Sequence, residues 1–193
     1  MTAPLLTVGH GAAGAEELAA LLRGAGVTLV VDVRRYPGSR AHPHTARDEM
    51  ARWLPAAGVR YRWDGRLGGR RRAGADSPDT WWRVASFRGY AAHMRGEEFR
   101  AAVVDLLADV ASGRTAVMCS ESLWWRCHRR LIADFVTLAT DTPVCHLAHD
   151  GRLTGHPPSA GARRCADGLL RYDVEAPDRA GPVPAGAPPP AAG

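Results

Sequence analysis

Residues 115–130, which read TAVMCSESLWWRCHRR, decide the fold of this chain. Residues 115–118 form a short apolar run with β-branched side chains at two positions, which is typical of a buried strand in a parallel sheet. The polar residues 120–122 then offer the side chains that begin helices. Apolar and partly apolar residues follow at helical spacing, namely Leu123, Trp124, Cys127, Leu131, Ile132 and Phe135. The stretch therefore predicts a strand, a tight loop and a helix that starts after Ser122.

This arrangement places Cys119 at the carboxyl end of a strand, facing the amino end of a helix. Ligands bind at this edge of open α/β sheets. The helix dipole, Arg126 and Arg129 all favour a thiolate over the ordinary thiol, whose pKa is about 8.5. Cysteine at a strand end is also often a small buried hydrophobic residue, and this alternative stays open. As further candidate catalytic groups we take Glu121 in the loop and His10, which follows the first strand.

The rest of the chain alternates between strand-like and helix-like segments. Buried or half-buried strands are expected at residues 5–9, 28–33, 59–63 and 144–148, and helices at 15–23, 45–56 and 97–111. The alternation predicts a doubly wound, mostly parallel, Rossmann-like three-layer sheet with helices on both faces and right-handed crossovers. Residues 1–176 are expected to form one α/β domain. Residues 177–193 are almost entirely Pro, Ala and Gly, which predicts a disordered tail.

The amino-acid composition indicates which classes of partner the protein is expected to bind. All 25 basic residues are arginine, and the net charge of +5 suits anionic partners. No apolar run approaches the roughly 20 residues that a membrane span needs, and no signal peptide is recognisable. We therefore expect a cytoplasmic protein without a membrane partner. In that compartment the four cysteines are expected to be free rather than paired in disulfides.

Arginines recur where predicted strands end or helices begin. These residues are Arg34, Arg40, Arg70, Arg88, Arg126 and Arg129. Guanidinium groups match the geometry of phosphate and carboxylate, so the sequence predicts a pocket for a small anionic ligand. We expect Arg34, Arg88 and Arg129 to form it, with His10 and Asp32 in its wall and Asp32 orienting one arginine. Tyr90 is a candidate for stacking on a base.

The pair Cys127 and His128 lies within the predicted helix. Adjacent helical residues point about 100° apart, so the two are not expected to face one small site. Cys127 shares its spacing with Leu123 and Leu131 and is expected to pack in the core. His128 is expected to form structural hydrogen bonds or to contact the ligand. Structural zinc sites usually contain cysteines two to four residues apart, and this chain has no such pair, so we expect no metal and no cofactor.

Five motifs occur in order along residues 5–150. They are Gly9-His10, Asp32-Val33-Arg34 with Pro37-Gly38-Ser39-Arg40, Leu67-Gly68-Gly69-Arg70, Phe87-Arg88-Gly89-Tyr90, and Met118-Cys119 with Glu121 and Cys127-His128-Arg129. In this pattern the chain resembles the bacterial and archaeal family catalogued as domain of unknown function 488. Two departures are Gly11, where serine or threonine is usual, and the bulky Trp124 and Trp125 in the loop. The resemblance implies a compact α/β domain and no settled activity.

Three functions remain open from the sequence. The first is an enzyme, a cysteine-dependent transferase or hydrolase, acting on a nucleotide-like or phosphorylated ligand. The second is a nucleic-acid-associated protein that handles or repairs modified bases with the same basic edge, although the sequence contains no recognisable nucleic-acid-binding module. The third is a regulator that binds a ligand without chemistry.

Overall fold

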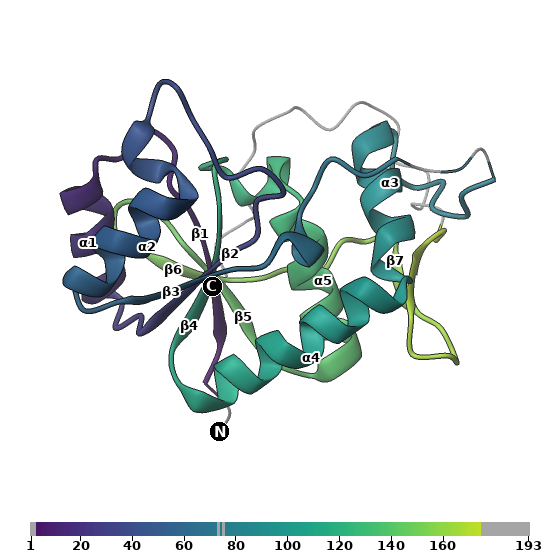
Figure 1. The fold of residues 1–193 in the computed structure, drawn as a ribbon. Coiled ribbons are helices and arrows are strands. Elements are labelled where there is room, and N and C mark those ends of the chain that lie inside the picture. The colour runs from purple at the N-terminus through teal and green to yellow at the C-terminus, as the bar shows by residue number, and fades with distance from the viewer. Residues whose placement is uncertain (1–2, 73, 75, 175–193) are drawn as a thin grey trace.

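The computed structural model describes residues 3–72, 74 and 76–174 (Figure 1). Its centre is a six-stranded sheet with the order β3-β2-β4-β1-β5-β6. Strands β1 to β5 run parallel to one another, and β6 pairs antiparallel with β5 at the edge of the sheet. The strands are β1 (Leu5–Gly9), β2 (Leu29–Asp32), β3 (Arg60–Trp63), β4 (Thr115–Cys119), β5 (Val144–Leu147) and β6 (Leu153–Gly155).

In the described part of the chain, five α-helices cover the two faces of this sheet. Figure 1 shows α1 and α2 on one face and α3, α4 and α5 on the other. Successive strand residues alternate between two separate hydrophobic clusters, so that Leu5 packs toward α3–α5 and Leu6 toward α1 and α2. The doubly wound α/β architecture is therefore confirmed. The helices are α1 (Ala15–Gly24), α2 (Arg47–Ala56), α3 (Ala85–Met94), α4 (Glu97–Ser112) and α5 (Arg129–Thr140).

The segment after β4 differs from its prediction. Helix α5 begins at Arg129, and the residues before it form the short 3₁₀ turn η3 (Trp124–Arg126) and an extended Cys127. The helix starts late because Trp124 does not lie on a helical face but stacks on His146, with ring centroids 3.9 Å apart. Two further 3₁₀ turns, η1 (Pro43–Thr45) and η2 (Gly65–Leu67), lie in loops at the carboxyl edge of the sheet. Residues 177–193, predicted to be a disordered tail, lie outside the described residues.

A hairpin of two short strands, β7 (Ala162–Arg164) and β8 (Leu170–Tyr172), was not predicted from the sequence. A buried carboxylate attaches this end of the chain to α5. Asp134 accepts hydrogen bonds from His156 Nε2 at 2.9 Å, from the Ser159 amide at 2.8 Å and from the Tyr172 hydroxyl at 2.9 Å. The whole set is buried, so these bonds compensate for the loss of solvent around the carboxylate.

The same network continues into the sheet through His146. Burial lowers the pKa of His146 to about 2, so its ring is neutral, and Nδ1 lies 2.7 Å from the Thr7 hydroxyl. Its Nε2 lies 2.9 Å from Nδ1 of His156. A continuous chain of hydrogen bonds thus connects β1, β5, α5 and β8.

No helix within the described ranges is long and apolar enough to cross a membrane.

The Asp134 network predicts a large effect of removing one carboxylate. Asp134→Ala leaves three buried donors without an acceptor and should lower the free energy of unfolding by about 3 kcal/mol or more. Tyr172→Phe removes one of these bonds and should cost about 1–2 kcal/mol. Asp48→Ala, at an exposed carboxylate, should change stability by no more than about 0.5 kcal/mol. Chemical denaturation measures all three, and equal stability of the Asp134 and Asp48 variants would show that the network contributes nothing.

Candidate functional site

The carboxyl ends of β1, β2 and β4 enclose a cavity of about 360 Å³, which we call the strand-end cavity. Because these three strands are neighbours in the sheet, the residues that follow them meet at one edge. The titratable side chains that line the cavity are His10, Arg34, Arg35, Tyr36, His42, Arg70, Cys119 and His128. The sequence predicted five of these eight. Arg35, Tyr36 and His42 were missed, although Arg35 and Tyr36 directly follow Arg34 in the same loop.

Arg34 is held by a buried ion pair with Asp32. Its Nε and Nη2 donate to the two carboxylate oxygens at 2.9 and 2.6 Å, and Nη2 also donates to the Thr45 carbonyl at 2.7 Å. Burial opposes the charge of Arg34, but the bonds to Asp32 outweigh it and raise the pKa of the guanidinium. The charge of Arg34 is therefore compensated within the protein. Arg34 forms part of the cavity wall and is not free to bind an anionic ligand.

His10 positions Arg34 and is poorly suited to the catalytic role predicted for it. Its Nδ1 donates to the Gly11 carbonyl at 2.9 Å, and its Nε2 accepts from Arg34 Nη1 at 3.2 Å. Burial and the neighbouring charge of Arg34 lower the pKa of His10 to about 4. The ring is neutral at physiological pH, and both of its nitrogens are occupied.

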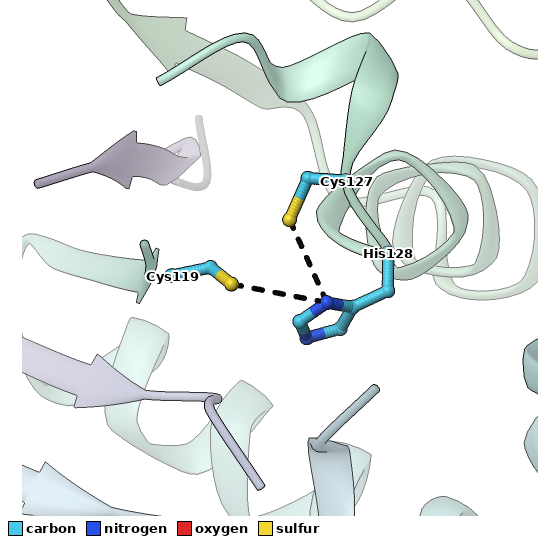
Figure 2. A group of neighbouring side chains, drawn as sticks. All are labelled: Cys119, Cys127 and His128. Carbon is cyan, nitrogen blue, oxygen red and sulfur yellow. Dashed lines mark hydrogen bonds between the residues drawn. The ribbon is translucent and has the colours of Figure 1, made fainter. Parts of the chain in front are cut away.

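Two sulfur atoms and one imidazole nitrogen meet beside the cavity, a group that we call the sulfur–imidazole cluster (Figure 2). Two of its members, Cys119 and His128, line the cavity. Nδ1 of His128 lies 3.9 Å from Sγ of Cys119 and 3.5 Å from Sγ of Cys127, and the three atoms all lie within 4.8 Å of one another. The other ring nitrogen, Nε2, donates to the Val33 carbonyl at 2.9 Å. In the neutral ring this leaves the lone pair of Nδ1 facing the two sulfurs.

The convergence of Cys127 and His128 contradicts the prediction that they face different directions. That prediction assumed a helical backbone, whereas Cys127 is extended, with φ −123° and ψ 151°. Two glycines make room for the segments of the site. A Cβ at Gly9 would overlap the carbonyl of Glu121, and a Cβ at Gly69 would lie 2.9 Å from His128 Nδ1. These contacts explain physically why glycines occur at the end of β1 and after η2.

Arg129 is the most deeply buried arginine of the site, with only 1% of its surface exposed. Its Nε donates to Cys127 Sγ at 3.4 Å, and Nη2 donates to the Glu121 carbonyl. Within the described part of the chain no carboxylate lies within 4.0 Å of this guanidinium. A buried charge needs a counter-charge, and the sulfur of Cys127 is in the position to supply it.

The surroundings of the two thiols favour the thiolate at Cys127 over the thiolate at Cys119. A hydrogen bond from Cys119 and the charge of Arg129 lower the pKa of Cys127 to about 6, although burial opposes this. The same hydrogen bond and burial raise the pKa of Cys119 to about 12. Cys127 is buried, as expected for a core residue, but it also holds the first thiolate of the pair.

Several predicted ligand-binding residues lie away from the cavity. Arg88 lines a separate hollow with Arg71 and Arg72. Arg129 does not line the strand-end cavity either, so of the three arginines expected to form one pocket only Arg34 lies in the cavity wall. Arg40 and Arg126 are exposed, and neither lines the strand-end cavity.

Two more predicted residues have roles other than those expected. Tyr90 is fully buried, donates to the Leu67 carbonyl at 2.6 Å and has its ring 5.1 Å from that of His128, so it supports the imidazole rather than stacking on a base. The carboxylate of Glu121 is exposed and accepts from the Leu123 amide, while its carbonyl binds Arg129. The backbone of Glu121, and not its side chain, therefore belongs to the site.

The coupled thiols predict a two-step titration in reduced protein that has been treated with a chelator. With Cys145 and Cys165 replaced by serine, ultraviolet absorbance should show one thiolate forming near pH 6 and none of the second below about pH 10. Because the pKa of Cys127 is lowered on folding, its contribution to stability is present above the pKa of an ordinary thiol and is lost as pH falls through about 6. Cys119→Ala should move the first step upward. Simultaneous ionisation of both thiols near pH 9 would contradict the coupling.

Comparison with known proteins gives one match. The model of the family described as domain of unknown function DUF488 matches residues 14–136, a range that includes Asp32, Arg34 and all three residues of the sulfur–imidazole cluster. Neither a search of curated proteins nor a search of solved structures found a match. The matched range covers well over half of the chain, and the chain belongs to the DUF488 family.

Proposed function

We propose that this protein is an enzyme that binds a small nucleotide-like or phosphorylated anion in the strand-end cavity and acts on it with the sulfur–imidazole cluster. The observation that carries this proposal is that Cys119 and His128 line the same cavity as Arg35 and Arg70. Reactive groups and cationic groups therefore face one enclosed volume. The volume of about 360 Å³ is at the lower end of the range for small-molecule sites, which favours a small ligand.

The charge of the cavity supports an anionic ligand. Arg34 is neutralised by Asp32, but neither Arg35 nor Arg70 has a carboxylate within 4.0 Å among the residues that the structure describes. Arg35 Nη1 donates to the Arg70 carbonyl at 3.0 Å, which holds the two residues together. Their remaining N–H groups are available at the mouth of the cavity, and guanidinium forks recognise phosphate through paired hydrogen bonds.

The cluster supports transfer or hydrolysis as the reaction class. Sulfur and an imidazole nitrogen with a directed lone pair are groups that enzymes use in nucleophilic catalysis, in proton transfer and as metal ligands. Cys119 lines the cavity, so chemistry at this cluster is within reach of a bound ligand.

A nucleic-acid partner is the second candidate, and one observation favours it. Arg35 and Arg70 also line an adjoining hollow with Arg71 and Arg72. A chain of phosphates could follow this surface away from the cavity, as backbone-binding proteins do. No comparable observation favours a regulator without chemistry.

Removing the free arginines should weaken binding of a phosphate or a mononucleotide. Arg35→Ala and Arg70→Ala each remove charge-assisted hydrogen bonds and should lower the affinity about 10-fold, measured by calorimetry at low salt. Arg23→Ala is the matched control, because Arg23 is an exposed arginine in the last turn of α1, away from the cavity. Unchanged affinity in the two cavity variants would exclude these arginines as ligand-binding residues.

Salt dependence separates the two candidate functions. Binding of a mononucleotide should weaken only modestly with added salt, whereas a nucleic acid bound through many phosphates loses affinity steeply. Steep salt dependence with an oligonucleotide, combined with no detectable binding of the mononucleotide, would favour the nucleic-acid partner over the enzyme.

A further inference from the structure

We infer that Cys119, Cys127 and His128 form a binding site for a thiophilic divalent cation, best matched by zinc, whose fourth coordination position opens into the strand-end cavity. The metal site stands on the geometry of the three ligand atoms. Its role in the reaction rests on the proposed function, which it deepens by assigning the chemistry to a metal centre rather than to a cysteine nucleophile.

The spacing of the three atoms suits tetrahedral zinc. With Zn–S bonds of about 2.3 Å and Zn–N bonds of about 2.05 Å, a tetrahedral site separates sulfur from nitrogen by about 3.6 Å. The observed sulfur–nitrogen distances of 3.5 and 3.9 Å agree with this value within about 0.3 Å. The sequence contains no cysteine pair two to four residues apart, but the fold brings the end of β4 next to the residues before α5, so that Cys119, Cys127 and His128 meet.

The surroundings of the three atoms orient them as ligands. Metal-binding histidines usually donate their other ring N–H to a carbonyl or carboxylate, and His128 Nε2 donates to the Val33 carbonyl. Arg129 Nε donates to Cys127 Sγ, which fixes the direction of that sulfur. These are the outer contacts expected around a metal site, and both are made by buried or half-buried groups.

The chemical nature of the three ligand atoms favours one class of cation. Their number leaves one coordination position of a tetrahedral cation without a protein ligand. Two thiolates and an imidazole favour zinc over the hard cations magnesium and calcium, which prefer oxygen. Three protein ligands are typical of catalytic zinc sites, where water or substrate takes the fourth position. Cys119 and His128 line the strand-end cavity, so the open position faces the volume proposed for the anionic ligand.

The charges in the site agree with this assignment. Two thiolates balance a divalent cation, and the buried Arg129 then leaves a net charge of +1 close to the cavity floor. An anion in the cavity would compensate that charge. Asp32 does not, because its carboxylate is engaged by Arg34 and by the Tyr61 hydroxyl at 2.7 Å.

Zinc titration against a chromophoric chelator tests the site on the full-length, reduced, chelator-treated protein. The wild type should bind one equivalent. Cys119→Ser, Cys127→Ser and His128→Ala should each weaken binding by more than about 100-fold, the upper end of what loss of an outer-shell contact costs. Cys145→Ser and Cys165→Ser are the matched controls, since these half-buried thiols lie outside the cluster, and they should bind as the wild type does.

Cobalt substitution keeps the test independent of whether the variants fold. Cobalt bound to the wild type should show thiolate-to-metal charge transfer and the intense visible bands of a tetrahedral site. Absence of zinc binding by the wild type, a cobalt spectrum without thiolate bands, or binding that is lost equally in the control variants would overturn the proposal. Ready oxidation of Cys119 and Cys127 to a disulfide in wild type that takes up no zinc would also overturn it and assign the pair to redox chemistry.

The proposed metal site and the proposed anionic ligand can be rejected independently of each other. Phosphate binding, measured with and without zinc, reports on the strand-end cavity. Zinc bound with no phosphate binding under either condition would keep the metal site and reject the proposed ligand. Phosphate binding that depends on Arg35 and Arg70, in a protein without zinc affinity, would reject the metal site and keep the ligand.

Discussion

The site depends on one hydrogen bond, from Nε2 of His128 to the carbonyl of Val33. It ties the residue before α5 to the end of β2, two segments that are far apart in the chain. It also determines which ring nitrogen carries the proton in the neutral imidazole, and therefore which nitrogen offers a lone pair to the two sulfurs. Gly69 makes room for this ring, and Tyr90 packs beside it. A different tautomer would turn an N–H toward Cys119 and Cys127, and the cluster would then lose its capacity to bind a cation or to accept a proton.

Buried arginines in this protein fall into two groups with different physical roles. Arg34 is matched by Asp32, so this pair fixes the loop after β2 and contributes no net charge. Arg129 is more deeply buried, and among the described residues its partners are a carbonyl and a sulfur, so its charge is available to stabilise a thiolate or an anion nearby. Partial exposure, rather than position after a strand, distinguishes Arg35 and Arg70, which keep free N–H groups at the mouth of the cavity. Whether its guanidinium already has a partner within the protein thus distinguishes an arginine that supports the structure of the site from one that can bind a ligand.

The hydrophobic pattern was enough to predict the five parallel strands of the central sheet, because buried parallel strands such as β1 and β4 appear as continuous apolar runs bounded by glycine or polar residues. The pattern failed after β4, where Leu123, Trp124 and Cys127 imitate helical spacing although Trp124 packs on His146. It also missed β6, β7 and β8, whose three residues each are too few to show a period of two. Cys119, His10 and Arg34 were predicted from their place at or directly after the ends of strands. The contribution of Cys127 was not, since it depends on an extended backbone and on contacts with distant segments.

The most direct test of the central claim is nitrogen NMR of the His128 side chain in the reduced, metal-free protein. Two-bond correlations distinguish the two neutral tautomers by the nitrogen that carries the proton. In the neutral ring the geometry predicts that Nε2 carries the proton and that Nδ1 does not, with the Nε2 proton protected by its bond to Val33. A neutral ring with its proton on Nδ1, or an Nε2 proton that exchanges freely with water, would contradict the account, because the lone pair would then not face Cys119 and Cys127.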